Sequence, residues 1–240
     1  MELTDHAGRR RLVLPAQLRP GDIERLRRAL GEVSEYDLVT LEGSGGVFCE
    51  GGALPPDEAD TGNGPRPFGA LLSALERKPG PVVALVDGVA LGAGVGLAAA
   101  ADLVLSSPDA RFGLPETLLG LIPAMVFPVL ARRIGAPRAR LLALGHPPLS
   151  ADQARDWGLV DEVTHDLEAA LRRHQRRFTR MGPQALASLK ALVADHFGSP
   201  AGYTEQAASC FAALLRTPDA RGRIERTVAG ETPWPAEEEP

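Results

Sequence analysis

The chain has 240 residues, of which 44% are apolar and 24% charged, so it can bury a sizeable core and is not a disordered, collagen-like or coiled-coil chain. Its 31 acidic and 26 basic residues give a net charge of −5, without the basic excess that nucleic-acid binding usually needs. Two cysteines, Cys49 and Cys210, cannot build a disulfide framework or a four-ligand zinc site and suit a reducing compartment. The longest weakly polar stretch, 88–101, is too short to span a bilayer. We therefore expect a cytoplasmic protein with no membrane or nucleic-acid partner.

Hydrophobic periodicity predicts strands and helices that alternate along the first two thirds of the chain. Apolar runs predict strands at 11–14, 37–41, 82–86, 103–106, 110–112 and 159–163. Helical spacing predicts helices at 21–33, 68–77, 92–101, 126–134, 137–144 and 151–157, the last capped by Ser150 and ended by Gly158, and a helical turn at 116–119. The segment 42–67 is rich in Gly, Pro and acids, and we expect a long loop of the kind that often carries function.

The chain is predicted to be helical from 167 onward, with helices at 167–180, 183–196, 202–215 and 218–228. Strands that alternate with helices, followed by helices alone, indicate an α/β fold with a helical C-terminal region. We expect a core at 1–165, a helical region at 166–235 that belongs to the same structural unit, and a tail at 236–240.

Two glycine-rich segments follow predicted strands. Gly51 and Gly52 allow a sharp turn, in which the Gly52 N–H is available to a ligand, although a plain glycine turn is the common alternative. The second segment, 92–96, reads GAGVG and opens a helix, whose first N–H groups have no carbonyl partner and favour an anionic oxygen. It is not a dinucleotide fingerprint, because Leu97 stands where the third glycine belongs. Tight helix packing through small residues is the alternative.

Glu116 follows a proline and lies among apolar residues in the segment FGLPETLLGLIP. A desolvated carboxyl there has a raised pKa and suits proton transfer. A helix N-terminal acid stabilised by the helix dipole is the equal alternative. The five histidines show no metal-ligand spacing, so we expect no metal site, and His146 is expected to be structural or exposed. Cys49 is expected to be a small buried residue.

The segments VVALVDGVALGAGVGLAAAADLVLSS, RFGLPETLLGLIP and LSADQARDWGLVDEV resemble the crotonase (enoyl-CoA hydratase/isomerase) superfamily in order and spacing. The resemblance implies repeated ββα units with a C-terminal helical region, assembled as homotrimers or dimers of trimers. It also implies that two backbone N–H groups bind a thioester oxygen and stabilise an enolate. The positions of these oxyanion-hole donors fall on Gly52 and Ala93.

The sequence departs from the family pattern at two positions. Hydratases of this family use two glutamates; the second falls on Glu116, whereas the first falls on Gly96, which has no side chain. Ala53 replaces an aspartate that many members carry. A single glutamate is still able to remove an α-proton and then protonate a departing β-hydroxyl, or to shuttle a proton between two carbons.

The segment GLIPAMVFPVLARRIG is similar to the dehydratase-type homologues of polyketide β-branching cassettes. That likeness implies dehydration of 3-hydroxy-3-methylglutaryl on an acyl carrier protein to 3-methylglutaconyl, with no cofactor beyond the phosphopantetheine or CoA thioester. Four arginines offer a docking face for an acidic carrier, with ordinary solvated helix charge as the alternative: Arg132, Arg133, Arg138 and Arg140.

Two other functions stay open. One is an enoyl-CoA hydratase or isomerase that acts on free acyl-CoA. The other is a catalytically silent subunit that binds a partner, which the missing glutamate at Gly96 favours and the presence of Glu116 disfavours. If Glu116 is not the acid/base, the next candidates are Glu50 and the loop acids Asp57, Glu58 and Asp60.

Overall fold

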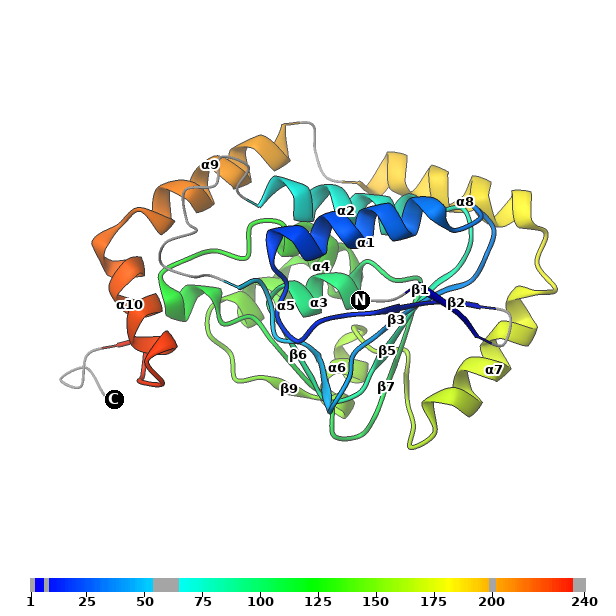
Figure 1. The fold of residues 1–240 in the computed structure, drawn as a ribbon, viewed down its shortest axis with the longest axis horizontal. Helices are drawn as coiled ribbons and strands as arrows, with labels where there is room; N and C mark the ends of the chain where they lie inside the picture. The colour runs from blue at the N-terminus through cyan, green and yellow to red at the C-terminus, as the bar shows by residue number, and fades with distance from the viewer. Residues whose placement is uncertain (1–2, 7–8, 54–64, 199–201, 235–240) are drawn as a thin grey trace.

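The computed structural model describes residues 3–6, 9–53, 65–198 and 202–234, which form two β-sheets covered by helices (Figure 1). The larger sheet has the strand order β1-β2-β3-β5-β7-β10 and the smaller β4-β6-β8-β9. The strands of the larger sheet are β1 Leu3–His6, β2 Arg9–Val13, β3 Val39–Glu42, β5 Val82–Val86, β7 Leu103–Ser106 and β10 Glu162–Val163. Those of the smaller sheet are β4 Val47–Cys49, β6 Val89–Leu91, β8 Arg111–Gly113 and β9 Leu149–Ser150.

The helices follow the strands in a repeating order. Within the described ranges they are α1 Pro20–Glu32, α2 Arg66–Arg77, α3 Ala93–Ala99, the 3-10 helix η1 Glu116–Leu119, α4 Val126–Ile134, α5 Ala136–Ala143, α6 Ala151–Trp157, α7 Leu167–Phe178, α8 Pro183–Phe197, α9 Tyr203–Leu215 and α10 Pro218–Val228. Three times, one strand enters the larger sheet, the next enters the smaller sheet, and a helix follows: β3-β4-α2, β5-β6-α3 and β7-β8-η1. The predicted α/β class and the ββα repeat are confirmed.

Parallel pairing at the centre of the larger sheet explains the continuous apolar run of β5. Ala84 pairs with Leu41 of β3 on one side and with Val104 of β7 on the other. Every residue of β5 is buried, as expected for a strand covered on both faces. Helices α1 and α2 pack side by side over one face, and α7 covers the other through Leu171 (Figure 1).

Lys190 attaches the helical region to the sheets. Its Nζ, on α8, donates to Asp102 Oδ2 at 2.5 Å and to the carbonyl of Gly80 at 3.1 Å. The predicted boundary at residue 165 stays a prediction. Within the four described stretches, no helix has the length and apolarity needed to cross a bilayer.

Most predicted elements are confirmed within a few residues, and four short strands were missed. The capping box at Ser150 and the αL conformation of Gly158, with φ of 88°, bound α6 as expected. The prediction of a continuous loop at 42–67 was wrong at both ends, because β4 lies inside it and α2 begins at Arg66; residues 54–64 lie outside the described residues. The strand predicted at 159–163 is reduced to β10, since Leu159 and Val160 both donate to the carbonyl of Ala154 at the end of α6.

Candidate active site

The turn after β4 lies directly beside the start of α3. Gly51 has φ of 113°, and a Cβ added there would lie 3.4 Å from the carbonyl oxygen of Leu91 and 3.8 Å from the nitrogen of Ala93. The Gly51 carbonyl accepts a bond from Leu18 N–H at 2.8 Å, which fixes the turn. Gly52 is exposed, and its N–H donates no hydrogen bond to any other described residue. The turn therefore presents an unpaired donor next to Ala93.

Ala93 is the first residue of α3, so its N–H has no carbonyl one turn earlier to bond. The preceding Gly92 has φ of 51°, a conformation that glycine adopts readily, and donates to the carbonyl of Gly113 at 2.9 Å. Gly94 must be small, because a Cβ there would lie 2.1 Å from the carbonyl oxygen of Cys49. The GAGVG segment thus brings the helix start close to the first glycine turn, as both proposed donors require.

Glu116 begins η1 and directs its carboxyl toward this helix start. A Cβ added at Gly92 would lie 3.0 Å from Glu116 Oε1. Oε2 is buried and has no hydrogen-bond partner among the residues that the structure describes. Burial raises the pKa of Glu116 to about 7, and a bond from its own N–H opposes this only in part. The structure therefore brings together Gly52, Ala93 and Glu116, the three site residues predicted from the sequence.

The position of the missing glutamate is filled by apolar side chains. Gly96 is buried in α3, and a Cβ added there would lie 3.0 Å from Val126 Cγ2 and 3.5 Å from Phe68 Cε1 and Cζ. The sequence identified neither Phe68 nor Val126 as part of the site, because nothing in the local pattern shows that α2 and α4 meet at Gly96. A side chain that begins at this place therefore meets apolar neighbours first.

The arrangement combines two unpaired N–H donors with one desolvated carboxyl. Donors of this kind stabilise a negative charge that develops on a substrate oxygen. A carboxyl with a pKa near the working pH can both accept and donate a proton. Among the described residues, no group of three or more His, Cys, Asp and Glu side chains gathers as a metal site would require.

The other predicted candidates take structural or surface positions. Cys49 is buried and its pKa is raised to about 11 by burial, so it is not a nucleophile at neutral pH. His146 Nδ1 donates to the neighbouring Pro147 carbonyl at 2.6 Å, and its ring packs against Trp157, with ring centroids 5.4 Å apart. Glu50 is exposed. The loop acids at 57, 58 and 60 lie outside the described residues.

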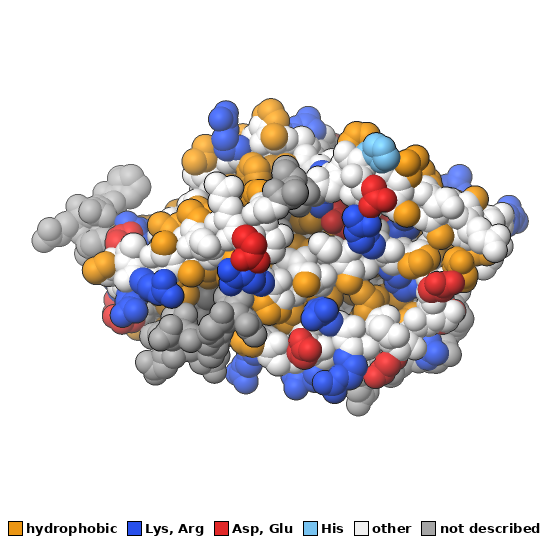
Figure 2. All heavy atoms as spheres, turned by 90° about the horizontal axis from the view of Figure 1, so that it is seen from above, with side chains coloured by type: hydrophobic (Ala, Val, Ile, Leu, Met, Phe, Trp, Pro, Cys, Tyr) orange, Lys and Arg blue, Asp and Glu red, His pale blue; other side chains and the backbone are white. Residues whose placement is uncertain are grey.

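The four arginines do not form one free basic face. Arg132 bonds both carboxylate oxygens of Glu76, at 2.6 and 2.8 Å. Arg133 donates to two backbone carbonyls and pairs with an aspartate. Arg138 and Arg140 are exposed on α5. Figure 2 shows the molecule from above the view of Figure 1, and on this face acidic and basic side chains are interspersed among apolar ones.

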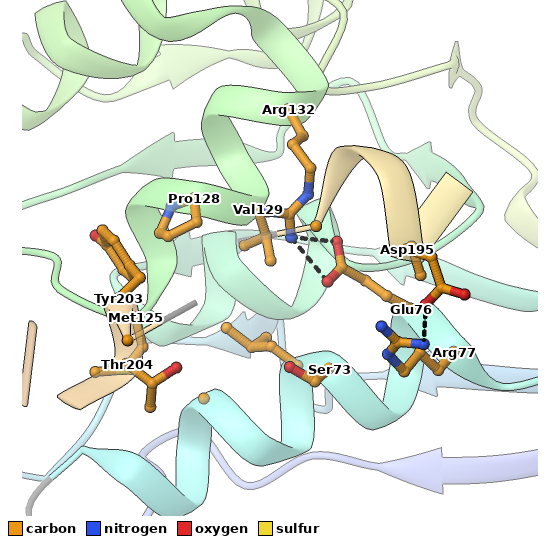
Figure 3. Close-up of a pocket in the computed structure, with 15 residues that line it drawn as sticks. Ser73, Glu76, Arg77, Met125, Pro128, Val129, Arg132, Asp195, Tyr203 and Thr204 are labelled. Atoms are coloured by element: carbon orange, nitrogen blue, oxygen red, sulfur yellow. Dashed lines mark hydrogen bonds and ion pairs between the residues drawn. The ribbon is translucent and has the colours of Figure 1, made fainter. Parts of the chain in front are cut away.

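A hollow of about 380 Å³ lies among α2, α4, α8 and α9, away from Glu116 (Figure 3). Its charged side chains neutralise one another, because Arg132 pairs with Glu76 and Arg77 pairs with Asp195 at 2.8 Å. Glu116 is not among its lining residues. We therefore place the chemistry at Glu116 rather than in this hollow.

Comparison with known protein families identifies the class of protein to which the chain belongs. The family model of enoyl-CoA hydratase/isomerase matches residues 23–219, and the chain belongs to this family. It is an enzyme of the hydratase/dehydratase class, a lyase. The resemblance to the crotonase superfamily that the motifs indicated is confirmed.

The chain is also similar to individual members of this family. The bacillaene synthase dehydratase PksH of Bacillus subtilis strain 168 is 31% identical over 212 residues, which cover 85% of this chain and 81% of the relative. The crystal structure of B. subtilis PksH matches with a TM-score of 0.89 at 26% identity and covers 98% of both chains. The 1,2-epoxyphenylacetyl-CoA isomerase of Escherichia coli K12 is 36% identical over 168 residues, covering 62% of this chain and 64% of the relative.

Proposed function

We propose that the chain dehydrates a 3-hydroxyacyl thioester, 3-hydroxy-3-methylglutaryl on an acyl carrier protein, to the 3-methylglutaconyl thioester in polyketide β-branching. The observation that carries this proposal is the single carboxyl of Glu116 beside two unpaired N–H groups, with apolar side chains where a second carboxyl would lie. One acid/base group suffices to move a proton from carbon to a leaving hydroxyl, whereas addition of water by two glutamates needs both.

The thioester oxygen is bound between the N–H groups of Gly52 and Ala93. As the α-proton leaves, negative charge moves from carbon to this oxygen, and the two donors stabilise the enolate. Loss of one such donor costs about 2.7–4 kcal/mol in the barrier. Because the turn at Gly51 is fixed by hydrogen bonds and Ala93 by its helix, the donors need no rearrangement during the reaction.

Glu116 performs both proton transfers. Its carboxylate removes a proton from C2, and the resulting carboxyl protonates the hydroxyl on C3, which departs as water while the enolate electrons form the C2–C3 double bond. The carboxylate is regenerated, so atoms and charge balance without a cofactor. A pKa of about 7 serves both steps near neutral pH. One group working from one position requires that proton and hydroxyl leave from the same face of the substrate.

The carrier-bound substrate is supported by the relatives and by the surface. PksH, named as a dehydratase of bacillaene synthase, shares length and fold with this chain. Arg138 and Arg140 are exposed on α5, where an acidic carrier protein would find two basic side chains.

We also propose that the chain assembles into trimers. Helix α8 leaves several apolar side chains more than two-fifths exposed: Leu189, Leu192, Val193 and Phe197. Contiguous exposed apolar side chains mark contact surfaces in soluble proteins, and a second copy would cover them. Light scattering coupled to size exclusion should give three chains or a multiple of three, and a monomer at micromolar concentration would contradict this.

Intact-mass spectrometry of the loaded carrier protein tests the proposed reaction. The purified chain should remove one water from 3-hydroxy-3-methylglutaryl-carrier protein, and Glu116→Gln should not. An unchanged carrier mass together with turnover of free crotonyl-CoA would instead identify a hydratase or isomerase of acyl-CoA. Absence of both activities would favour the silent partner subunit.

A further inference from the structure

The carboxyl of Glu116 makes no hydrogen bond to any other residue that the structure describes. Its position therefore depends on the backbone of η1, a single turn closed by the Leu121 N–H bond to the Glu116 carbonyl at 2.8 Å. A one-turn 3-10 helix has little stability of its own. Whatever holds this turn in place also holds the carboxyl.

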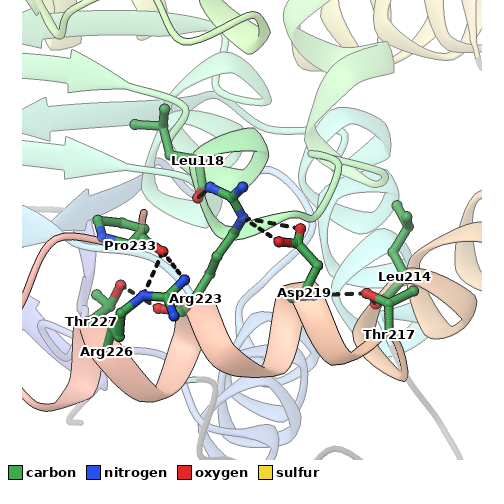
Figure 4. Close-up of polar contacts among 9 residues, drawn as sticks. Leu118, Leu214, Thr217, Asp219, Arg223, Arg226, Thr227 and Pro233 are labelled. Atoms are coloured by element: carbon green, nitrogen blue, oxygen red, sulfur yellow. Dashed lines mark hydrogen bonds and ion pairs between the residues drawn. The ribbon is translucent and has the colours of Figure 1, made fainter. Parts of the chain in front are cut away.

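Helix α10 packs against η1 and contacts its backbone (Figure 4). Arg223 Nε lies 3.0 Å from both carboxylate oxygens of Asp219, one turn earlier on the same helix. This ion pair directs the guanidinium toward η1, where Nη1 donates to the carbonyl of Leu118 at 3.4 Å. Thr217 caps the helix by accepting from the N–H of Ala220 at 3.2 Å, so the first turn that carries Asp219 is itself fixed.

Gly120 ends η1 in contact with the same helix. It has φ of 73°, and a Cβ added there would lie 3.1 Å from Ala220 Cα and 3.1 Å from Asp219 Oδ2. The turn and the helix thus meet backbone to backbone. A small apolar cluster completes the contact, and its buried members are Leu121, Leu215, Ala220 and Ile224.

We infer that α10 fixes the position of Glu116 through η1 and that Asp219 and Arg223 form a positioning pair for the reaction. This inference rests on the proposed role of Glu116 as the acid/base. The enoyl-CoA hydratase/isomerase model matches only to residue 219, so nearly all of α10 lies beyond the matched region. The other flank of η1 is held separately, since Thr117 Oγ1 donates to the carbonyl of Ala143 at 2.8 Å. Loss of the α10 contact should therefore shift the turn without unfolding the chain.

The test compares Arg223→Gln with Arg221→Gln, which makes the same charge change at an exposed position of the same helix. With loaded carrier protein as substrate, Arg223→Gln should lower kcat by about 10- to 100-fold, because small misplacements of a reacting group cost this much. KM should stay within about threefold, since the Gly52 and Ala93 donors are untouched. The acidic limb of kcat/KM should move to lower pH, because a displaced carboxyl gains water. Arg223→Lys should restore part of kcat.

The displacement of the Glu116 carboxyl can also be detected without substrate. The side-chain carboxyl of Glu116, assigned by its absence in Glu116→Gln, should titrate lower in Arg223→Gln by ¹³C NMR, and Arg221→Gln should match the parent chain. If Arg223→Gln does not fold, Asp219→Asn gives the same comparison. A folded variant with the parent's kcat and titration would overturn the inference, as would a fall in kcat with an unmoved titration. Those results leave the proposed function intact, whereas full activity of Glu116→Gln would remove the proposed function itself.

Discussion

Glu116→Gln should stabilise the protein at high pH while it removes activity. Burial raises the pKa of this carboxyl from its ordinary value of 4.5 to about 7. Each pKa unit corresponds to about 1.4 kcal/mol, so the ionised native state is less stable by about 3 kcal/mol than it would be with an unperturbed carboxyl. A neutral amide of similar shape does not carry this cost.

The sign and the pH window follow from proton counts. Between pH 4.5 and 7 the native state holds a proton on Glu116 that the unfolded state has lost, so the free energy of unfolding falls as pH rises. Below pH 4.5 both states are protonated, and the parent chain and Glu116→Gln should be similarly stable. The difference should grow through this window and level off above pH 7, where the variant should melt about 6 to 12 °C higher.

Thermal unfolding of both proteins at several pH values from 4 to 8.5 provides the measurement. Glu32→Gln makes the same substitution at an exposed position of α1 and is the matched control. If the melting temperatures of Glu116→Gln and of the parent chain change with pH in parallel, or if the variant is the less stable protein at pH 8, the Glu116 carboxyl is not desolvated and its pKa is not raised by burial.

Further predictions address the turn, the helical region and the thiols. Gly51→Ala should lower kcat about 100-fold, because φ of 113° and the Leu91 carbonyl oppose a Cβ at this position. Gly21→Ala, at a position with open space around the added Cβ, should leave kcat unchanged. Equal kcat values for the two variants would refute the assignment of the Gly52 N–H as an oxyanion-hole donor. Lys190→Met should lower the free energy of unfolding by about 1–3 kcal/mol, since it leaves Asp102 and the Gly80 carbonyl without their donor; an unchanged denaturation midpoint would contradict this. Ellman's reagent should modify only Cys210 in the native protein and also Cys49 in denaturant, and rapid reaction of both would show that Cys49 is not buried.

Much of the fold could be predicted from short sequence patterns. Ser150 and Gly158 bound a helix by capping chemistry that needs no tertiary information. Glu116 was singled out by its place after a proline among apolar residues, whereas the donor positions Gly52 and Ala93 came from the resemblance to the family; the roles of all three stay predictions. Three strands of the smaller sheet, β4, β6 and β9, were missed because they are two or three residues long, which is too short for a period-two pattern to appear, whereas β8 was predicted at 110–112. The packing of Phe68 and Val126 on Gly96, and of α10 on η1, joins segments far apart in the chain and leaves no local trace.

The central claim is that one carboxyl, Glu116, both removes the C2 proton and protonates the C3 hydroxyl. A single group at one position can do so only if both leave from the same face of the substrate. The direct measurement uses 3-hydroxy-3-methylglutaryl-carrier protein with deuterium placed stereospecifically at one of the two C2 positions, followed by mass spectrometry of the enoyl product and assignment of its double-bond geometry. Our account predicts syn elimination, with loss of the hydrogen isotope on the same face as the hydroxyl. Anti elimination would require a second acid or base and would contradict it.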